Sequence, residues 1–361
     1  CDDGVNAFYR AYNGREPAKP AAIAYAGAHP NGFNPKLYNA MWGPSEFACT
    51  GSLKEYDGEP LLAKLDGGRT IFLGGQYDEA RKKYLYAADL YHKTGDTEGE
   101  AFVYSRLGEL ELSLDNYKEA EKALRQSTAL VENYIDGQNT YGEALIKLSK
   151  VQTASGEDEK ALQTIKKAQE VTAATDNKNL LGDAYEQEAY ICLLNNKEQQ
   201  ALEKYRLAAD LFNQDGTTLK EAATLRAMAR LEMKFKNYDV AHDLLERCRD
   251  LYRENGDLLG EASALSAIGC LRYIIRDIPN ARKALMKSVY LYGKVSHHFA
   301  EAEALLYLAR VEAFNQEQGD FERAKIHYKR SIELFDFLEN ETMKRAVLDE
   351  YHDFLNRIST L

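Results

Sequence analysis

Small residues recur along this chain at an interval of about 40 positions. The first series consists of alanines separated by 40, 41, 40, 40, 40 and 43 residues: Ala80, Ala120, Ala161, Ala201, Ala241, Ala281 and Ala324. A second series lies seven residues after the first: Ala87, Ser127, Ala168, Ala208, Cys248, Ser288 and Ser331. A third series lies twelve residues before the first: Gly68, Gly108, Ser149, Ala189, Ala229 and Gly269. Three coincident series over seven repeats predict a repeat protein.

The last repeat departs from this spacing in one respect. Its third small residue is Ala309, which lies fifteen rather than twelve residues before Ala324. This difference predicts an insertion of three residues between the two helices of that repeat.

Large apolar residues accompany the small ones at helical spacing. They lie four residues after each alanine of the first series: Tyr84, Leu124, Ile165, Tyr205, Leu245, Leu285 and Tyr328. Spacings of three, four and seven residues place side chains on one face of an α-helix. Two antiparallel helices approach closely only where small side chains face each other, and larger residues then fill the space beside them. The pattern therefore predicts seven helical hairpins.

This pattern resembles the tetratricopeptide repeat family, whose repeats have small residues at the eighth, twentieth and twenty-seventh positions. The resemblance covers residues 60–340, and an apolar segment at 341–361 resembles a capping helix. It implies an all-α solenoid of seven hairpins that forms a right-handed superhelix. In such a solenoid the first helices of the hairpins line the concave surface.

The repeats here are longer than the 34-residue form of the family and lack the proline that ends its second helix. Without that proline the second helix can run further. Glycines are expected to end these helices in the left-handed conformation: Gly95, Gly137, Gly216 and Gly256. This longer form is similar to the repeats of kinesin light chains, of mitotic-spindle adaptors and of bacterial peptide-sensing regulators.

Residues 1–59 differ from the repeats and are called the N-terminal arm below. Six of the seven prolines lie within the first 60 residues, where no helical period persists. A flexible tether is one interpretation, because proline and glycine resist regular structure. However, large rings such as Tyr38, Trp42 and Phe47 are costly to leave in water. We therefore expect the arm to be ordered against its own solenoid or against a partner.

The residue at position 1 is a cysteine rather than a methionine. This start resembles the mature end of a bacterial lipoprotein, whose first cysteine carries the lipid. The resemblance implies lipidation of Cys1 and a place in the bacterial cell envelope, at a membrane and facing the periplasm or the exterior. Two alternatives remain open: a disulfide between Cys1 and Cys49 in an oxidising compartment, or an unmodified chain in the cytoplasm.

Composition and motifs argue against several classes of function. The formal net charge is -11 and there is no block of basic residues, which disfavours nucleic acid as a partner. No phosphate-binding loop, nucleophile elbow or zinc-binding pattern occurs. Adjacent His297 and His298 point about 100° apart on a helix and cannot easily share one metal ion. We expect no catalytic residue, metal, cofactor or small-molecule substrate.

Family positions that face the concave surface provide the candidate binding residues. The resemblance assigns these positions to Lys150, Glu186, Tyr190, Arg226, Arg230, Tyr273, Arg310 and Phe314. Arg226 and Arg230 lie four residues apart on one helical face, and guanidinium groups bind carboxylates through paired hydrogen bonds. The aromatic residues could supply apolar anchors for a peptide. The alternative is that these arginines only pair with acids such as Glu186 between repeats.

The repeats predict a non-enzymatic scaffold or adaptor that binds a partner protein through its groove or its arm. With Cys1 lipidated, it would hold that partner at a membrane. Two alternatives remain: a cytosolic adaptor or peptide-binding regulator, and a structural subunit of a larger membrane-associated assembly.

Overall fold

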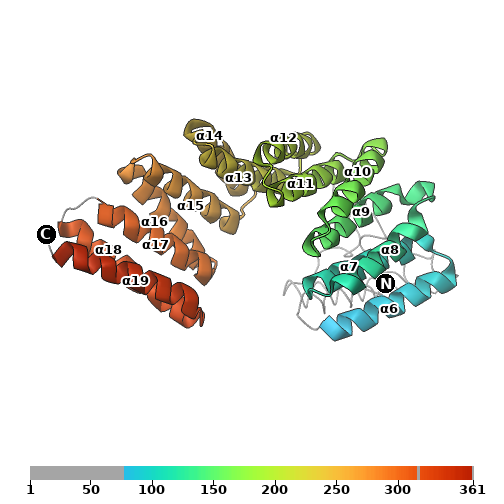
Figure 1. Ribbon diagram of the computed structural model, residues 1–361, viewed down its shortest axis with the longest axis horizontal. Coiled ribbons are helices and arrows are strands. Elements are labelled where there is room, and N and C mark those ends of the chain that lie inside the picture. The colour runs from blue at the N-terminus through green and yellow to red at the C-terminus, as the bar shows by residue number, and fades with distance from the viewer. Residues whose placement is uncertain (1–76, 315–317, 360–361) are drawn as a thin grey trace, which may run out of the picture. The chain divides into compact units, whose positions relative to one another are not determined.

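The computed structural model describes residues 77–314 and 318–359 of the chain. These ranges contain fourteen α-helices, one 3-10 helix and no strand (Figure 1). Their bounds are α6 (Tyr77–Thr94), α7 (Thr97–Ser113), α8 (Tyr117–Val131), η2 (Ile135–Gly137), α9 (Gln138–Ala154), α10 (Asp158–Ala174), α11 (Lys178–Leu194), α12 (Glu198–Asp215), α13 (Thr218–Lys234), α14 (Tyr238–Glu254), α15 (Leu258–Ile274), α16 (Ile278–Lys294), α17 (His298–Phe314), α18 (Gln318–Phe337) and α19 (Glu341–Ser359). The predicted all-α class is confirmed.

The N-terminal arm and the first helix predicted for the first repeat lie outside the described residues. The predictions for Cys1, Tyr38, Trp42, Phe47 and Cys49 therefore stay predictions, and so does the position of Gly68.

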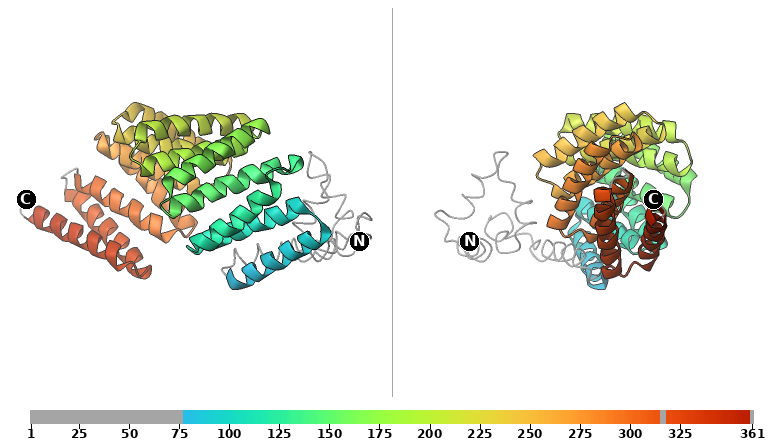
Figure 2. Two further views of the ribbon diagram at one scale, coloured as in Figure 1. Left: turned by 45° about the vertical axis from the view of Figure 1, so that its right-hand side comes forward. Right: turned by 90° about the vertical axis from the view of Figure 1, so that its left-hand side faces the viewer.

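The chain divides into two compact units, Cys1–Leu180 and Leu181–Leu361. In the first unit, each helix from α6 to α9 packs against the helix that follows it in the chain. In the second unit, each helix from α12 to α18 packs against the helix that follows it. Figure 2 shows this for the last helices of the chain, drawn in orange and red. Within each unit the first helices of successive hairpins also contact each other, since α7 touches α9 and α15 touches both α13 and α17.

The described members of the three series of small residues lie at close contacts between helices. Among the described members of the first and second series, every side chain has zero solvent exposure. In the third series, Gly108 and Gly269 approach Leu124 and Leu285 so closely that an added Cβ would lie 2.4 and 2.5 Å from the leucine Cγ. Both leucines belong to the predicted large apolar series. A small residue on one helix therefore makes room for a large residue on its partner.

The serines of the second series also form a hydrogen bond across the hairpin. The Oγ of Ser127 donates to the carbonyl oxygen of Ala101 at 2.7 Å. Ser288 donates to Ala262 at 2.8 Å, and Ser331 donates to Ala302 at 2.8 Å. Burial of a hydroxyl without a partner is costly, so these bonds make serine an acceptable small residue in the hairpin core.

The ends of the helices confirm three of the four predicted glycine stops. Gly95, Gly216 and Gly256 have positive φ values of 72°, 78° and 70°, but Gly137 has a φ of -91°. Gly137 instead ends η2 and directly precedes α9. The repeat from Ala120 to Ala161 is one residue longer than most, and the connection between α8 and α9 is where η2 forms.

Most of the other left-handed turns are formed by residues that the sequence did not mark as stops: Asp115, Asp176, Asn196, Lys236, Arg276, Ser296 and Glu339. For a residue with a side chain this conformation costs about 1–2 kcal/mol. A backbone bond that closes the turn offsets this cost, such as Asn237 N to the Glu232 carbonyl at 2.8 Å. The backbone hydrogen bonds of the short turn therefore outweigh the preference of these residues for a negative φ.

The three residues inserted in the last repeat lengthen α18 at its N-terminal end. Ala324 is the seventh residue of α18, whereas the anchoring alanines are the fourth residues of α8, α10, α12, α14 and α16. The insertion was predicted between the two helices, and this position is corrected to the first turn of α18. Asp320 in this turn is buried and accepts a bond from Arg282 at 3.2 Å.

Replacement of Gly269 by leucine tests the close packing of the hairpin. We expect it to destabilise the protein by about 1–3 kcal/mol, because the new side chain must displace Leu285. The measurement is urea unfolding followed by circular dichroism. The matched control is Gly293→Ala, where an added Cβ meets nothing nearer than 3.7 Å and helix propensity favours alanine by up to about 1 kcal/mol. Equal stability of both variants would contradict this packing.

Candidate functional site

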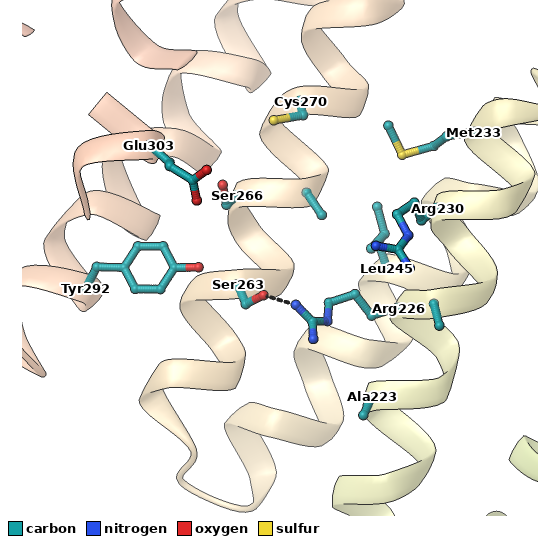
Figure 3. A pocket seen from close by; sticks show the side chains of 12 residues that line it. Ala223, Arg226, Arg230, Met233, Leu245, Ser263, Ser266, Cys270, Tyr292 and Glu303 are labelled. Carbon is teal, nitrogen blue, oxygen red and sulfur yellow. Dashed lines mark hydrogen bonds between the residues drawn. The ribbon is translucent and has the colours of Figure 1, made fainter. Parts of the chain in front are cut away.

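A groove lies in the second unit on the first helices of three successive hairpins, α13, α15 and α17 (Figure 3). Its volume is about 390 Å³. The lining residues are Ala223, Arg226, Ala227, Arg230, Met233, Leu245, Ser263, Ser266, Ala267, Cys270, Tyr292 and Glu303.

The repeat register explains why these side chains share one surface. Arg226 and Arg230 of α13 correspond, 40 residues later, to Ser266 and Cys270 of α15. Equivalent positions in stacked repeats face the same way, because each hairpin packs on the next in the same manner. The α15 side chains Ser263, Ser266 and Ala267 are small, so they leave room above that helix for a ligand.

Arg226 and Arg230 differ from most other arginines of the second unit because no carboxylate pairs with them. The Nη1 of Arg226 donates to the Oγ of Ser263 at 2.6 Å. Within residues 77–314 and 318–359, neither guanidinium group forms a salt bridge, and both side chains are exposed. Arginines of this unit that do pair with carboxylates are Arg206, Arg247, Arg249, Arg253, Arg272, Arg282, Arg310, Arg323 and Arg330.

Arg310 was predicted for the same surface but has a structural partner. Its Nε and Nη2 donate to the two carboxylate oxygens of Glu350 in α19 at 2.8 and 2.7 Å. The hydroxyl of Tyr328 also donates to Glu350 at 2.8 Å. Burial acts to raise the pKa of Glu350, but these hydrogen bonds and the nearby positive charge hold it below its usual value. For Arg310, therefore, the alternative holds: this arginine pairs with an acid of the same chain.

Two predicted aromatic anchors come together, although they do not line the groove. The rings of Tyr273 and Phe314 meet edge to face with centroids 6.2 Å apart. The guanidinium of Arg276 lies 4.4 Å from the centre of the Phe314 ring, at a distance typical of a cation–π contact. Phe314 remains 41% exposed, which leaves part of the ring open to a partner.

The remaining predicted residues lie on other helices. Tyr190 on α11 is 48% exposed. Glu186 on the same helix accepts a long hydrogen bond of 3.5 Å from the Thr224 hydroxyl. Lys150 is exposed on α9, which belongs to the first unit. None of these three residues lines the groove.

Of the residues that line the groove, only Arg226 and Arg230 were among the predicted binding residues; the polar side chains Ser263, Tyr292 and Glu303 are among those that sequence reasoning missed. Ser263 and Glu303 lie 40 residues apart at equivalent repeat positions, three residues before the position that Arg226 occupies in its own repeat. The repeat register could have identified both, since it places them at equivalent positions of successive first helices. Tyr292 comes from α16, a second helix, and no rule based on first helices would have included it.

A second cavity, of about 370 Å³, lies among α14, α15 and α16. Its basic residues are Arg249, Arg253, Arg272, Lys283 and Lys287. Four of these five cations already pair with carboxylates, such as Lys287 with the buried Glu261 at 2.6 Å. Most of the positive charge of this cavity is therefore already paired with carboxylates of the chain, in contrast to the arginines of the groove.

The described residues contain no arrangement typical of catalysis or of a metal site. In these parts of the chain no group of three or more His, Cys, Asp or Glu side chains could hold a metal ion. Cys270 lines the groove, but burial raises the pKa of its thiol to about 12. The thiol is therefore protonated near neutral pH and is a poor nucleophile.

Comparison with known proteins identifies the repeat. The sequence profile described as Tetratricopeptide repeat matches residues 68–133 and 100–174. Residues 68–174 therefore carry tetratricopeptide repeats. This confirms the resemblance drawn from the series of small residues. No match was found among curated protein sequences.

Solved structures share the fold of this tetratricopeptide repeat chain at low sequence identity. A signal transduction ATPase with numerous domains from Pyrococcus horikoshii, which has a tetratricopeptide repeat sensor, is 15% identical with a TM-score of 0.66. The match covers 86% of this chain and 47% of that protein. BtubC from P. vanneervenii is 15% identical with a TM-score of 0.56, over 63% of this chain and 92% of that one.

A third structure is a Rap protein complexed with Competence and Sporulation Factor. It is 14% identical to this chain with a TM-score of 0.51. The match covers 80% of this chain and 84% of that one. At these identities the likenesses establish the fold alone.

Alkylation of the cysteines tests the environment of the groove thiol. Burial raises the pKa of both Cys248 and Cys270 to about 12, so at about pH 8 their thiolate fraction is roughly 10³ times below that of a thiol with pKa 8.5. We expect iodoacetamide to modify both residues far more slowly in the folded than in the urea-unfolded protein. Mass spectrometry of peptides measures each site. Equal rates at Cys270 in the two states would show that its thiol is not desolvated.

Proposed function

We propose that this tetratricopeptide repeat protein is a non-enzymatic adaptor whose groove on α13, α15 and α17 binds an acidic segment of a partner protein. The observation that carries the proposal is the pair Arg226 and Arg230. They lie one helical turn apart, line the groove and lack carboxylate partners within the described residues.

The chemistry of the guanidinium group supports a carboxylate as the ligand. Each group presents parallel N–H donors that match the two oxygens of a carboxylate. A partly enclosed groove strengthens such bonds, because water competes less than at an open surface. The overall charge of -11 would repel an acidic segment elsewhere on the surface, so the local arginines would also orient it.

The family context supports a protein partner. Tetratricopeptide repeats are interaction modules whose stacked helices offer an extended surface to other proteins. The Rap protein of related fold was solved with Competence and Sporulation Factor bound. A peptide-binding regulator in the cytoplasm therefore remains an alternative to an adaptor at a membrane.

Charge reversal at the two arginines tests the groove. A displayed library of random peptides is first selected on the wild-type protein, and we expect Asp, Glu or a free C-terminus to be enriched. Selected peptides should bind the Arg226→Glu, Arg230→Glu variant at least about 100-fold more weakly, since hydrogen bonds to charged groups contribute about 1.5–3 kcal/mol each. Fluorescence anisotropy with labelled peptides measures the affinity.

The matched control is the double variant Lys283→Glu, Lys329→Glu. It makes the same change in net charge at two exposed lysines of second helices that do not line the groove. We expect it to bind the selected peptides within about twofold of the wild type. Wild-type affinity in the arginine variant would overturn the proposed function, whereas equal loss in both variants would mean that net charge alone drives binding.

Lipidation of Cys1 and a place in the bacterial envelope are a separate proposal, which rests on the sequence. No helix among the described residues is long and apolar enough to cross a membrane. We expect the intact protein from its native source to show a mass increased by a diacyl or triacyl group on Cys1. An unmodified mass together with a cytosolic location would contradict this proposal and favour the cytosolic adaptor.

A further inference from the structure

The groove also contains one carboxylate without a cationic partner. Glu303 of α17 lines the groove, and its side chain reaches solvent. Within the described parts of the chain, no lysine, arginine or histidine forms an ion pair with it. Partial burial raises the pKa of Glu303, and the nearby His297 opposes this rise. Its surroundings therefore leave the negative charge less well solvated than at an open surface.

Glu303 and the two arginines lie on opposite sides of α15 (Figure 3). The carboxylate points toward Ser266, while Arg226 reaches Ser263 from the other side. Between them, the hydroxyl of Tyr292 is influenced by both charges: burial raises the pKa of Tyr292, Arg226 lowers it and Glu303 raises it. The groove thus has a cationic wall on α13 and an anionic wall on α17, with small side chains between them.

We propose that the groove binds a dipolar peptide segment, in which Arg226 and Arg230 bind an acidic group and Glu303 binds a cationic group of the same ligand. This inference rests on the proposed function. It adds a positive charge on the ligand and the direction in which the ligand lies across the groove. The cationic group is a Lys or Arg side chain of the partner. A ligand in the reverse orientation would place like charges together at both walls, which disfavours it.

The separation of the walls limits the spacing of the two ligand charges. α13 contacts α15 and α15 contacts α17, and packed helices lie about 8–10 Å apart. The axes of α13 and α17 are therefore about 16–20 Å apart, and side chains reaching inward shorten the distance between the charges. At about 3.3 Å per extended residue, the acidic and basic residues of the ligand are separated by about two to five positions.

The peptides selected on the wild-type protein provide the test. We expect a Lys or Arg to recur at a fixed distance from the enriched acidic residue. One such peptide is then made in two forms, with lysine or with the uncharged norleucine at that position. Glu303→Gln should weaken binding of the lysine peptide about tenfold and leave the norleucine peptide unchanged. Glu303→Lys should favour a peptide with glutamate at that position.

Each outcome separates this inference from the proposed function. Glu254→Gln, at an exposed position of α14 outside the groove lining, is the matched control and should bind both peptides as the wild type does. The dipolar ligand is wrong if Glu303→Gln weakens binding of both peptides equally, or if no basic residue is enriched in the selected peptides. In either case, weaker binding by the arginine variant would still support an acidic ligand. If the arginine variant has no effect, the proposed function fails and this inference fails with it.

Discussion

The close contact between the two helices of each hairpin is the constraint on which the rest of the structure depends. Completely buried Ala, Ser and Cys side chains bring the helix backbones together, and a large residue such as Leu285 fills the space opposite Gly269. This contact fixes the rotation of both helices about their axes. Because it recurs at about 40 residues, equivalent positions of stacked first helices face the same way within a unit, and the groove inherits that alignment.

Charges in the second unit divide into two groups according to this packing. Arg310 is held by Glu350, and Lys287 is held by the buried Glu261, so these ion pairs join neighbouring helices. Arg226, Arg230 and Glu303 lack such partners in the described residues and line one groove. Packing therefore accounts for ion pairs such as these, whereas the groove gathers three charges that the described residues do not neutralise.

The sequence predicted the helices and their buried faces well, because sterics between neighbouring helices act directly on residue size. It predicted the turns less well: Gly137 does not end a helix in the left-handed conformation, whereas Lys236 and Arg276 do. The predicted groove surface included both Arg226 and Arg310, which sequence position alone could not separate. Their difference depends on Glu350, a residue of α19 that is 40 positions from Arg310 in the chain.

The sequence by itself determined the repeat, the all-α class and the repeat register, since each follows from residue size at fixed spacing. Only the tertiary structure decided which charged side chains have partners and that Glu303 and Tyr292 share a groove with the arginines. The physical reason is one of range. Close helix packing selects small residues at regular positions that can be read along the chain. Electrostatic pairing depends on which side chains of separate helices come within a few ångströms of each other, and that is set by the fold.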